Sequence, residues 1–331
     1  MEPACPLTEE SPISTGGSEV QFQAISFHPD LDRIRGYLDE KSTWKRGLAS
    51  LLHPREYERH AIVFQKNEIE TVIHRLSTLE KSNGHYHISL ISPFFKDIGL
   101  DESGGQLGSH GQFSFFLDPS RKGKRLLITR FLDLAVAVPA LTFWIPFHLL
   151  AVAAIRLTSR GEAIFRSERI GFKEKEFTVL KYRTMAISSN DSCHREFVSA
   201  IYEKQAESID DPDEVLKLTS DSRITPLGKV IRKLSIDEIP QLWNVLKGEM
   251  TLIGPRPCMD YEHEMMESWQ RRRFEVTPGL SGMWQVYGRS RCSIQQSHFL
   301  DSLFVYAQST ALYIRLVART PFAVLSMKGA C

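Results

Sequence analysis

Two adjacent carboxylates, Asp237 and Glu238, stand between Arg232 and Arg256, and this set of residue types suits phosphate chemistry. A carboxylate can attack an electrophile or hold a hard cation, and a guanidinium can bind two phosphate oxygens at once. Neighbouring residues on a helix project about 100° apart, because one turn takes about 3.6 residues. Asp237 and Glu238 can therefore hold different roles, one attacking a substrate while the other binds a metal.

A short helix must position this pair. The expected helix has one apolar face, formed by Ile239, Leu242 and Leu246. Gly248 follows as a stop signal, and Pro240 is tolerated only in a first turn, so the helix is predicted to begin near Asp237. Asp237 and Glu238 would then lie beside unpaired backbone N–H groups, which attract phosphate.

A structural role for the same residues stays open. Ser235 and Glu238 fit a capping box, in which each side chain bonds a backbone N–H and acidic groups favour the helix dipole. A cap needs neither arginine, however. Arg256 lies between Pro255 and Pro257, whose fixed φ angles hold the chain extended and aim the guanidinium.

With further motifs, these residues resemble the bacterial sugar transferase family, the monotopic polyprenyl-phosphate phosphoglycosyl transferases. The likeness runs from about Lys124 to Ala330. It rests on Arg130-Phe131-Leu132-Asp133, Phe165-Arg166, Glu168-Arg169-Ile170-Gly171, Lys181-Tyr182-Arg183-Thr184-Met185, Arg232, Asp237-Glu238, Pro240-Gln241, Trp243-Asn244, Gly254-Pro255-Arg256-Pro257, Pro278-Gly279, Gly282, Trp284-Gln285-Val286 and Gly288-Arg289.

The resemblance implies transfer of a sugar 1-phosphate from a UDP-sugar to undecaprenyl or another polyprenyl phosphate, with release of UMP. Asp237 would be the nucleophile that forms a phosphosugar-aspartyl intermediate, and Glu238 would hold Mg²⁺. Arg232 and Arg256 would bind substrate phosphates. The product would begin an exopolysaccharide, capsule or other surface glycan at the cytoplasmic face of the bacterial inner membrane.

Other functions and partners stay open at this point. The alternative function is a catalytically silent relative that scaffolds a glycan-assembly complex, and a membrane-anchored adaptor is a further class. Downstream glycosyltransferases and a second copy of the chain are partners that the resemblance allows. The nearly equal 41 basic and 40 acidic residues indicate no nucleic-acid partner. The five cysteines form no metal-ligand spacing and indicate reduced thiols.

The segment 134–155 carries no Asp, Glu, Lys or Arg and is long enough to be a transmembrane candidate. Pro139 and Pro146 interrupt it, and basic residues flank it on both sides, whereas Lys and Arg favour only the cytoplasmic side of a spanning helix. A re-entrant hairpin that bends near Pro146 is therefore predicted, as the resemblance also implies. Ile145 departs from the serine that is common before the bend proline in relatives.

The predicted fold class is α+β. It comprises a re-entrant membrane helix hairpin and a mostly helical catalytic domain with amphipathic interface helices, preceded by a small α/β module. The expected parts are a disordered tail at 1–18, the α/β module of unknown role at 19–98, a flexible linker at 99–123, the hairpin at 124–158 and the catalytic domain at 159–331. The first 17 residues lack an apolar core, so no signal peptide is expected there.

Local patterns predict the individual elements. Strands are expected at Val20–Phe27, His85–Ile91 and Glu176–Tyr182, and helices at Asp30–Lys41, Thr43–Leu52, Glu68–Glu80, Cys193–Glu207 and Tyr261–Phe274. Three arginines, Arg271 to Arg273, end the last of these helices and favour either lipid or nucleotide phosphate contact or a solvated helix end. Residues 307–331 suit an interface helix or a core helix. Tyr313, Glu162 and Ser167 stand where relatives commonly have aspartate, proline and glutamine.

Overall fold

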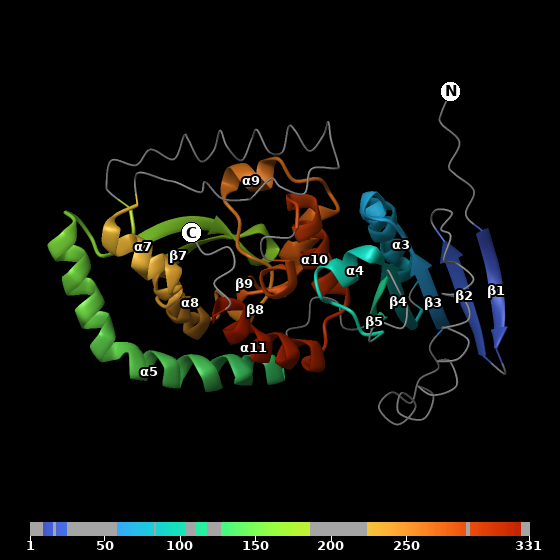
Figure 1. Cartoon of the computed structure of the whole chain (residues 1–331), viewed down its shortest axis with the longest axis horizontal. Coiled ribbons are helices and arrows are strands. Elements are labelled where there is room, and N and C mark those ends of the chain that lie inside the picture. Colours follow the sequence, from blue (N-terminus) through green and yellow to red (C-terminus); the bar gives the residue numbers. More distant parts are fainter. Residues whose placement is uncertain are drawn as a thin grey trace. The chain divides into compact units, whose positions relative to one another are not determined.

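A computed structural model of the chain describes residues 9–15, 18–24, 58–82, 84–103, 110–117, 127–185, 224–288 and 292–325. The chain divides into two compact units, Met1–Lys122 and Gly123–Cys331, which are treated separately below (Figure 1). The helices expected at Asp30–Lys41, Thr43–Leu52 and Cys193–Glu207 lie outside the described residues.

The first unit contains a five-stranded mixed sheet in the order β1-β2-β3-β4-β5. The three central strands are parallel, and each outer strand pairs antiparallel with its neighbour. The described elements are β1 (Glu9–Thr15), β2 (Ser18–Ala24), β3 (Glu58–Val63), η1 (Lys66–Glu68), α3 (Ile69–Lys81), β4 (Tyr86–Ser92), α4 (Pro93–Asp97) and β5 (Gly111–Leu117). Helix α3 and strand β4 confirm two predicted elements. The apolar face of α3 is buried through Val72, Ile73 and Leu76.

Two expectations about this unit are wrong. Strand β1 lies within the segment expected to be a disordered tail. Strand β5 lies within the expected linker and pairs with β4 from Gly111 opposite Ser92 to Leu117 opposite Tyr86. Its side chains Phe113, Phe115 and Leu117 are buried. The glycines around β5 suggested a linker, but the alternating aromatic residues after Gly111 gain more from burial in the sheet.

The second unit is mostly helical, with two small two-stranded sheets. Its described elements are α5 (Leu127–Thr158), β6 (Ile164–Ile170), η3 (Phe172–Glu174), β7 (Glu176–Tyr182), α7 (Pro226–Lys233), η4 (Ile236–Glu238), α8 (Gln241–Lys247), β8 (Thr251–Ile253), α9 (Asp260–Glu264), η5 (Gln270–Glu275), β9 (Gly279–Ser281), the π-helical turn η6 (Trp284–Gly288), α10 (Ile294–Tyr306) and α11 (Thr310–Leu325). The predicted strand at Glu176–Tyr182 is confirmed as β7, and its partner β6 was not predicted.

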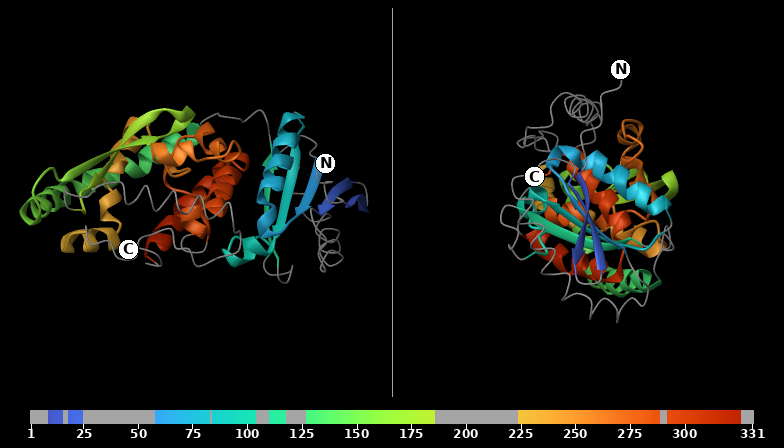
Figure 2. Two further views of the ribbon diagram at one scale, coloured as in Figure 1. Left: turned by 90° about the horizontal axis from the view of Figure 1, so that it is seen from above. Right: turned by 90° about the vertical axis from the view of Figure 1, so that its right-hand side faces the viewer.

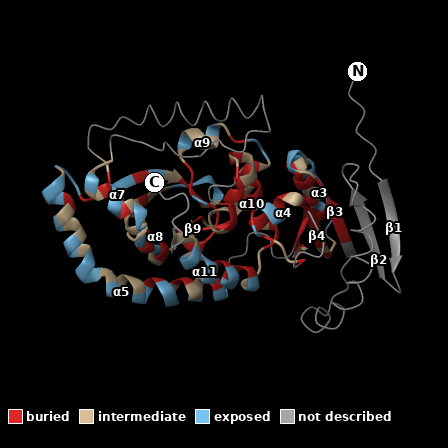
Figure 3. Ribbon diagram, in the orientation of Figure 1, coloured by how far each residue is buried: buried red, intermediate tan, exposed pale blue. Residues whose placement is uncertain are grey.

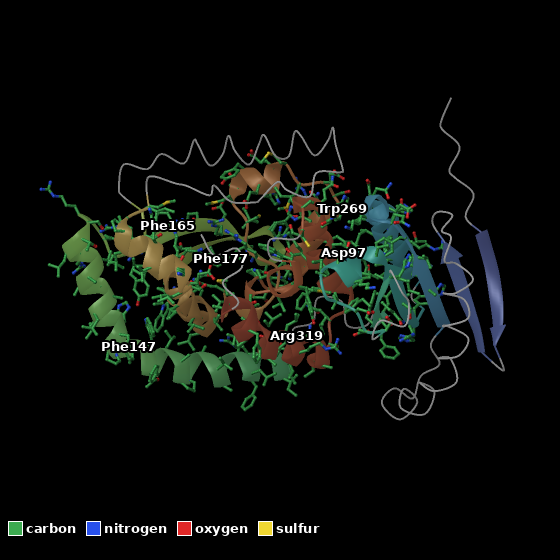
Figure 4. The ribbon with its side chains drawn as sticks, viewed as in Figure 1. Asp97, Phe147, Phe165, Phe177, Trp269 and Arg319 are labelled. Carbon is green, nitrogen blue, oxygen red and sulfur yellow. The ribbon has the colours of Figure 1, made fainter. Side chains whose placement is uncertain are left out.

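Helix α5 carries the expected membrane segment. It is continuous through Pro139 and Pro146, and Figure 1 shows it bent rather than folded into two antiparallel arms. Phe147 lies at the bend (Figure 4). Most of its apolar side chains are exposed, including Phe143, Ile145 and Leu150 (Figure 3). Among the described residues, α5 is the one helix that meets the length and composition of a membrane span. The re-entrant path itself stays a prediction.

The N-terminal part of α5 is tied to the rest of the unit by two polar side chains. Arg130 donates to the carbonyls of Val245 and Leu246, at 2.6 and 2.7 Å, and so caps the C-terminal end of α8. Asp133 is fully buried and accepts hydrogen bonds from Thr251 Oγ1, from the Leu252 amide and from the Tyr313 hydroxyl. Asp133 thus joins α5, β8 and α11, and Tyr313 has a structural role through its hydrogen bond to Asp133.

The segment around the bend is tied to strand β7. Tyr182 is buried, and its hydroxyl accepts from Trp144 Nε1 at 3.0 Å and lies 2.6 Å from His148 Nδ1. Trp144 and His148 flank Pro146. Strands β6 and β7 form a narrow two-stranded ribbon (Figure 2). Ile145 has no side-chain donor or acceptor, so it cannot form the hydrogen bond that a serine would form here. The contacts of Trp144 and His148 with Tyr182 supply polar anchoring at the bend instead.

The small parallel sheet of β8 and β9 requires glycine. Gly254 and Gly279 pack backbone against backbone, with hydrogen bonds from the Gly254 amide to Ser281 and from the Gly279 amide to Pro255, both 2.8 Å. A Cβ atom on Gly279 would lie 2.0 Å from the Gly254 nitrogen. Only a residue without a side chain permits this approach.

We therefore expect Gly279→Ala to destabilise the second unit by about 3 kcal/mol, since the backbone of Gly254 cannot move away without losing its hydrogen bond. Thermal unfolding of the detergent-solubilised protein measures the effect. Thr277→Ala, in the same loop and half-buried, is the control and should cost less than about 1 kcal/mol. Equal unfolding midpoints for the two variants would contradict the packing argument.

Candidate active site

Asp237 and Glu238 lie in the 3₁₀ turn η4, not in the first turn of the α-helix as predicted. Helix α8 begins after Pro240 and ends at Lys247, and the φ of 84° at the next residue, Gly248, confirms the predicted stop. Ser235 has a left-handed backbone conformation, with φ 54°, and its side chain makes no capping hydrogen bond. The capping box is therefore wrong. The left-handed residue instead turns the chain sharply between α7 and η4.

Asn244 fixes the position of strand β7 relative to this turn. Its buried amide accepts from the Leu180 amide at 3.2 Å and donates to the Thr178 carbonyl at 2.7 Å. The side chain therefore pairs with β7 as a neighbouring strand would. Asn244 also donates to Glu249 Oε2 at 2.7 Å, which completes its hydrogen bonds. This docking aligns the next residue, Lys181, with the carboxylate pair.

Lys181 is a residue that the sequence did not single out for the site. Its Nζ lies 3.4 Å from Glu238 Oε1. Burial lowers the pKa of Lys181, and the charges of Arg256 and Arg169 lower it further, whereas Glu238 and Asp237 raise it. The electrostatic neighbours of Lys181 thus include both carboxylates and Arg256. Its motif, Lys181-Tyr182-Arg183-Thr184, was visible in the resemblance, but an alternating strand pattern alone does not distinguish a site lysine from a surface one.

The environment of Asp237 differs from that of an ordinary surface aspartate. Burial raises its pKa, and the adjacent Glu238 charge raises it further, while Lys181 and Arg232 lower it. Two carboxylates held together by the chain therefore repel each other, and nearby cations offset part of this repulsion. Such opposed effects are typical of functional sites.

Arg232 precedes the carboxylate pair in the sequence, and Arg256 follows it. Arg232 lies in the last turn of α7, and its Nε donates to Thr184 Oγ1 at 2.8 Å. Arg256 is exposed while Pro255 and Pro257 are buried, so the prolines anchor the backbone and leave the guanidinium accessible. Asp237, Glu238 and Arg256 therefore lie within electrostatic reach of Lys181, and Arg232 lies within reach of Asp237, whereas Pro146 lies in α5.

The three consecutive arginines do not end a single helix, so the predicted solvated helix end is wrong, while contact with lipid or nucleotide phosphate stays a prediction. The expected helix at Tyr261–Phe274 is instead two short elements, α9 and η5. Arg271 donates to the carbonyls of Met266 and His263, and Arg272 lies 4.0 Å above the Tyr306 ring. Arg273 is buried and lies 2.8 Å from the Asp301 carboxylate. All three contact protein groups, because the break between α9 and η5 folds them inward rather than along one helix face.

The carboxylate of Glu238, beside that of Asp237, fits the Mg²⁺ that the resemblance implies. Mg²⁺ commonly takes one or two protein carboxylates and completes its ligands with water and substrate phosphates. Glu238 is partly exposed, and its charge repels Asp237, so a cation between substrate and Glu238 would be favourable. No group of three His, Cys, Asp or Glu side chains suited to a metal occurs among the described residues. A fully protein-made metal cage is therefore not present in this part of the chain.

Replacing Lys181 provides a test of these electrostatics. In Lys181→Met, loss of the cation should raise the pKa of Asp237 further, so the acid limb of the pH–rate profile should move to higher pH. Turnover at neutral pH should fall by roughly 100-fold, as for other lost charge-stabilising donors. Lys247→Met is the control, because Lys247 is exposed and pairs only at 3.7 Å with Glu249. If the acid limb of the pH–rate profile does not move in Lys181→Met, the electrostatic effect of Lys181 on Asp237 is refuted.

The chain belongs to the bacterial sugar transferase family, whose model matches residues 124–327, well over half of the 331 residues. The matched residues include the whole site and α5, and they lie within the second unit.

Relatives with assigned names match the same region. The UDP-galactose-lipid carrier transferase of Erwinia amylovora is 36% identical over 203 residues, which cover 61% of this chain and 41% of that protein. The undecaprenyl-phosphate galactose phosphotransferase of Salmonella typhimurium is 34% identical over 170 residues, or 51% of this chain and 35% of that protein. The exopolysaccharide production protein ExoY of Rhizobium meliloti is 33% identical over 200 residues, or 60% and 86%. The chain thus spans less than half of the first two relatives and most of the third.

Proposed function

We propose that this chain transfers a sugar 1-phosphate from a UDP-sugar to undecaprenyl phosphate and so begins the synthesis of a surface polysaccharide. The names of the relatives support a sugar donor, a lipid-carrier acceptor and an enzyme rather than the silent scaffold that the sequence left open. The observation that carries the proposal is the gathering of Asp237, Glu238 and Arg256 around Lys181, with Arg232 acting on Asp237.

The reaction divides into two displacements at one phosphorus. A carboxylate oxygen of Asp237 attacks the sugar-bearing phosphorus of the donor, the bond to the bridging oxygen breaks, and UMP leaves. An oxygen of the lipid phosphate then attacks the same phosphorus, and the Asp237–phosphorus bond breaks. The product is a polyprenyl diphosphate sugar, and the free carboxylate returns. Asp237 must be ionised for the first step, so the cations that lower its pKa favour attack.

Charge neutralisation falls to the residues around Asp237. The Lys181 ammonium and the Arg232 guanidinium lie where they reduce repulsion between a carboxylate and an anionic diphosphate. The exposed Arg256 can bind phosphate oxygens through two N–H groups. Glu238 would hold Mg²⁺, which when bound neutralises phosphate charge and assists the leaving group.

A screen of UDP-sugars with undecaprenyl phosphate tests the proposal. The purified full-length chain should release UMP and form a lipid-linked sugar diphosphate with one or a few donors. Labelled sugar phosphate should be trapped on Asp237 when lipid acceptor is omitted. Absence of UMP release and of trapped label with every donor would refute the proposed function.

We also propose that α5 enters and leaves the membrane on the cytoplasmic face. The exposed apolar side chains of α5, the basic residues on both its flanks and Pro146 at the bend support this path. The partners are then the membrane lipid, the two substrates and, downstream, other glycosyltransferases.

Thiol labelling of intact bacteria checks the orientation. Single cysteines replace Ser120 and Thr158 in a chain whose five native cysteines are removed. Thr158 is exposed at the end of α5, so its replacement disturbs little packing. Both cysteines should resist a membrane-impermeant reagent until the inner membrane is opened. Labelling of one cysteine alone, with only the outer membrane permeabilised, would show that α5 spans the bilayer.

A further inference from the structure

A buried charged cluster lies beneath the backbone at Arg256. Arg273, His298 and Asp301 are 6%, 4% and 1% exposed, and they come from η5 and α10. Arg273 Nη2 lies 2.8 Å from Asp301 Oδ2 and donates to the Arg256 carbonyl at 2.6 Å. Arg273 Nη1 lies 2.8 Å from His298 Nδ1. One guanidinium therefore connects α10 to the backbone that carries a phosphate-binding candidate.

The direction of each hydrogen bond follows from the chemistry of the groups. A guanidinium only donates, so His298 Nδ1 must accept and its ring must carry the proton on Nε2. Burial, assisted by the charge of Arg273, lowers the pKa of His298 well below the usual range and keeps the ring neutral. The ion pair with Asp301 and the hydrogen bond to His298 thus hold Arg273, and one N–H of Nη2 is directed at the Arg256 carbonyl.

Burial raises the pKa of Asp301 to about 7, and the charges of Arg273 and Arg256 oppose that rise. The influence of Arg256 shows that its side chain lies within electrostatic reach of Asp301. A buried ion pair of this kind contributes little net stability compared with apolar packing, and its better-attested role is to specify one conformation.

We propose that Asp301 and Arg273 are positioning residues that hold the Pro255-Arg256-Pro257 backbone and so aim the Arg256 guanidinium at substrate phosphate. The inference depends on the proposed function in one respect, namely that the group bound by Arg256 is a substrate phosphate. Proline restricts φ at two of the three residues, and Pro257 limits Arg256 to extended conformations without fixing one ψ angle. A hydrogen bond to the Arg256 carbonyl fixes the plane of the following peptide.

Hydrogen exchange tests the positioning without reference to turnover. In Asp301→Asn and in Arg273→Lys, the peptide covering residues 254–259 should exchange roughly tenfold faster or more than in wild type, because a charge-assisted hydrogen bond is lost or loosened. Arg273→Lys keeps the charge beside Asp301 but not the forked donors, so it remains informative if Asp301→Asn does not fold. Ser302→Ala is the matched control, buried on the same helix, with its hydroxyl directed at Trp269 instead. Unchanged exchange in a folded Asp301→Asn or Arg273→Lys protein would overturn the proposal.

A mutant cycle tests the link to Arg256. Asp301→Asn should lower kcat/KM by roughly tenfold or more in the wild-type background and cause no further loss in Arg256→Ala, because it acts through Arg256. Equal losses in both backgrounds would show a general structural role and overturn the proposal. A wild-type chain that turns over no UDP-sugar would instead refute the proposed function, while hydrogen exchange would still report on the positioning.

Discussion

Asp237→Asn is expected to abolish turnover, with a loss of roughly 10⁴-fold or more, while folding and membrane association persist. An amide oxygen cannot form the proposed intermediate, so labelled sugar phosphate should no longer be trapped. Measurement of UMP release and of label on the protein gives both results. Normal UMP release by this variant would remove Asp237 from the role of nucleophile.

The same variant should be at least as stable as wild type. The folded-state pKa of Asp237 is raised, so the stability that this carboxyl contributes is present at low pH and is lost as pH rises through that pKa. At neutral pH the ionised group is destabilising, and a neutral asparagine relieves burial and repulsion. Thermal unfolding at pH 7 should therefore show an equal or higher midpoint. Asp260→Asn, at an exposed position in α9, is the control and should keep full activity.

Glu238→Gln is expected to lower activity by roughly 100-fold or more and to raise the Mg²⁺ concentration needed for half-maximal rate. Glutamine keeps the volume but loses the charge of the proposed metal ligand. UMP release measured across a Mg²⁺ titration gives the apparent requirement. An unchanged requirement would leave Glu238 as a partner of Lys181 without a metal role.

The residual activity of Glu238→Gln should have a second signature. Because the Glu238 charge raises the pKa of Asp237, its removal should lower that pKa and move the acid limb to lower pH. This shift is opposite to the one expected for Lys181→Met, so the two variants together test the assigned charges. Glu176 is exposed at the start of β7, so Glu176→Gln is the control. It should alter neither the Mg²⁺ requirement nor the acid limb of the pH–rate profile.

Residue types and spacing were enough to predict the family and several elements, and the proposed chemistry of the site rests on them as well. The stop at Gly248, the strand β7 and the helix α3 depend on local backbone preferences and on apolar periodicity, both of which are visible in a single segment. The polar grouping of Asp237, Glu238, Arg232 and Arg256 is equally local, since one stretch of chain contains all four.

Tertiary contacts decided the rest. Lys181 belongs to the site because Asn244 docks β7 against α8, a pairing between residues far apart in the chain. Strand β5 is in the sheet because β4 pairs with it, although its glycine-rich neighbourhood resembles a linker. Arg273 is internal because α10 supplies Asp301 and His298 as partners. A charged or glycine-rich segment is compatible with either solvent or burial, and the choice depends on the partner that another part of the chain brings to it.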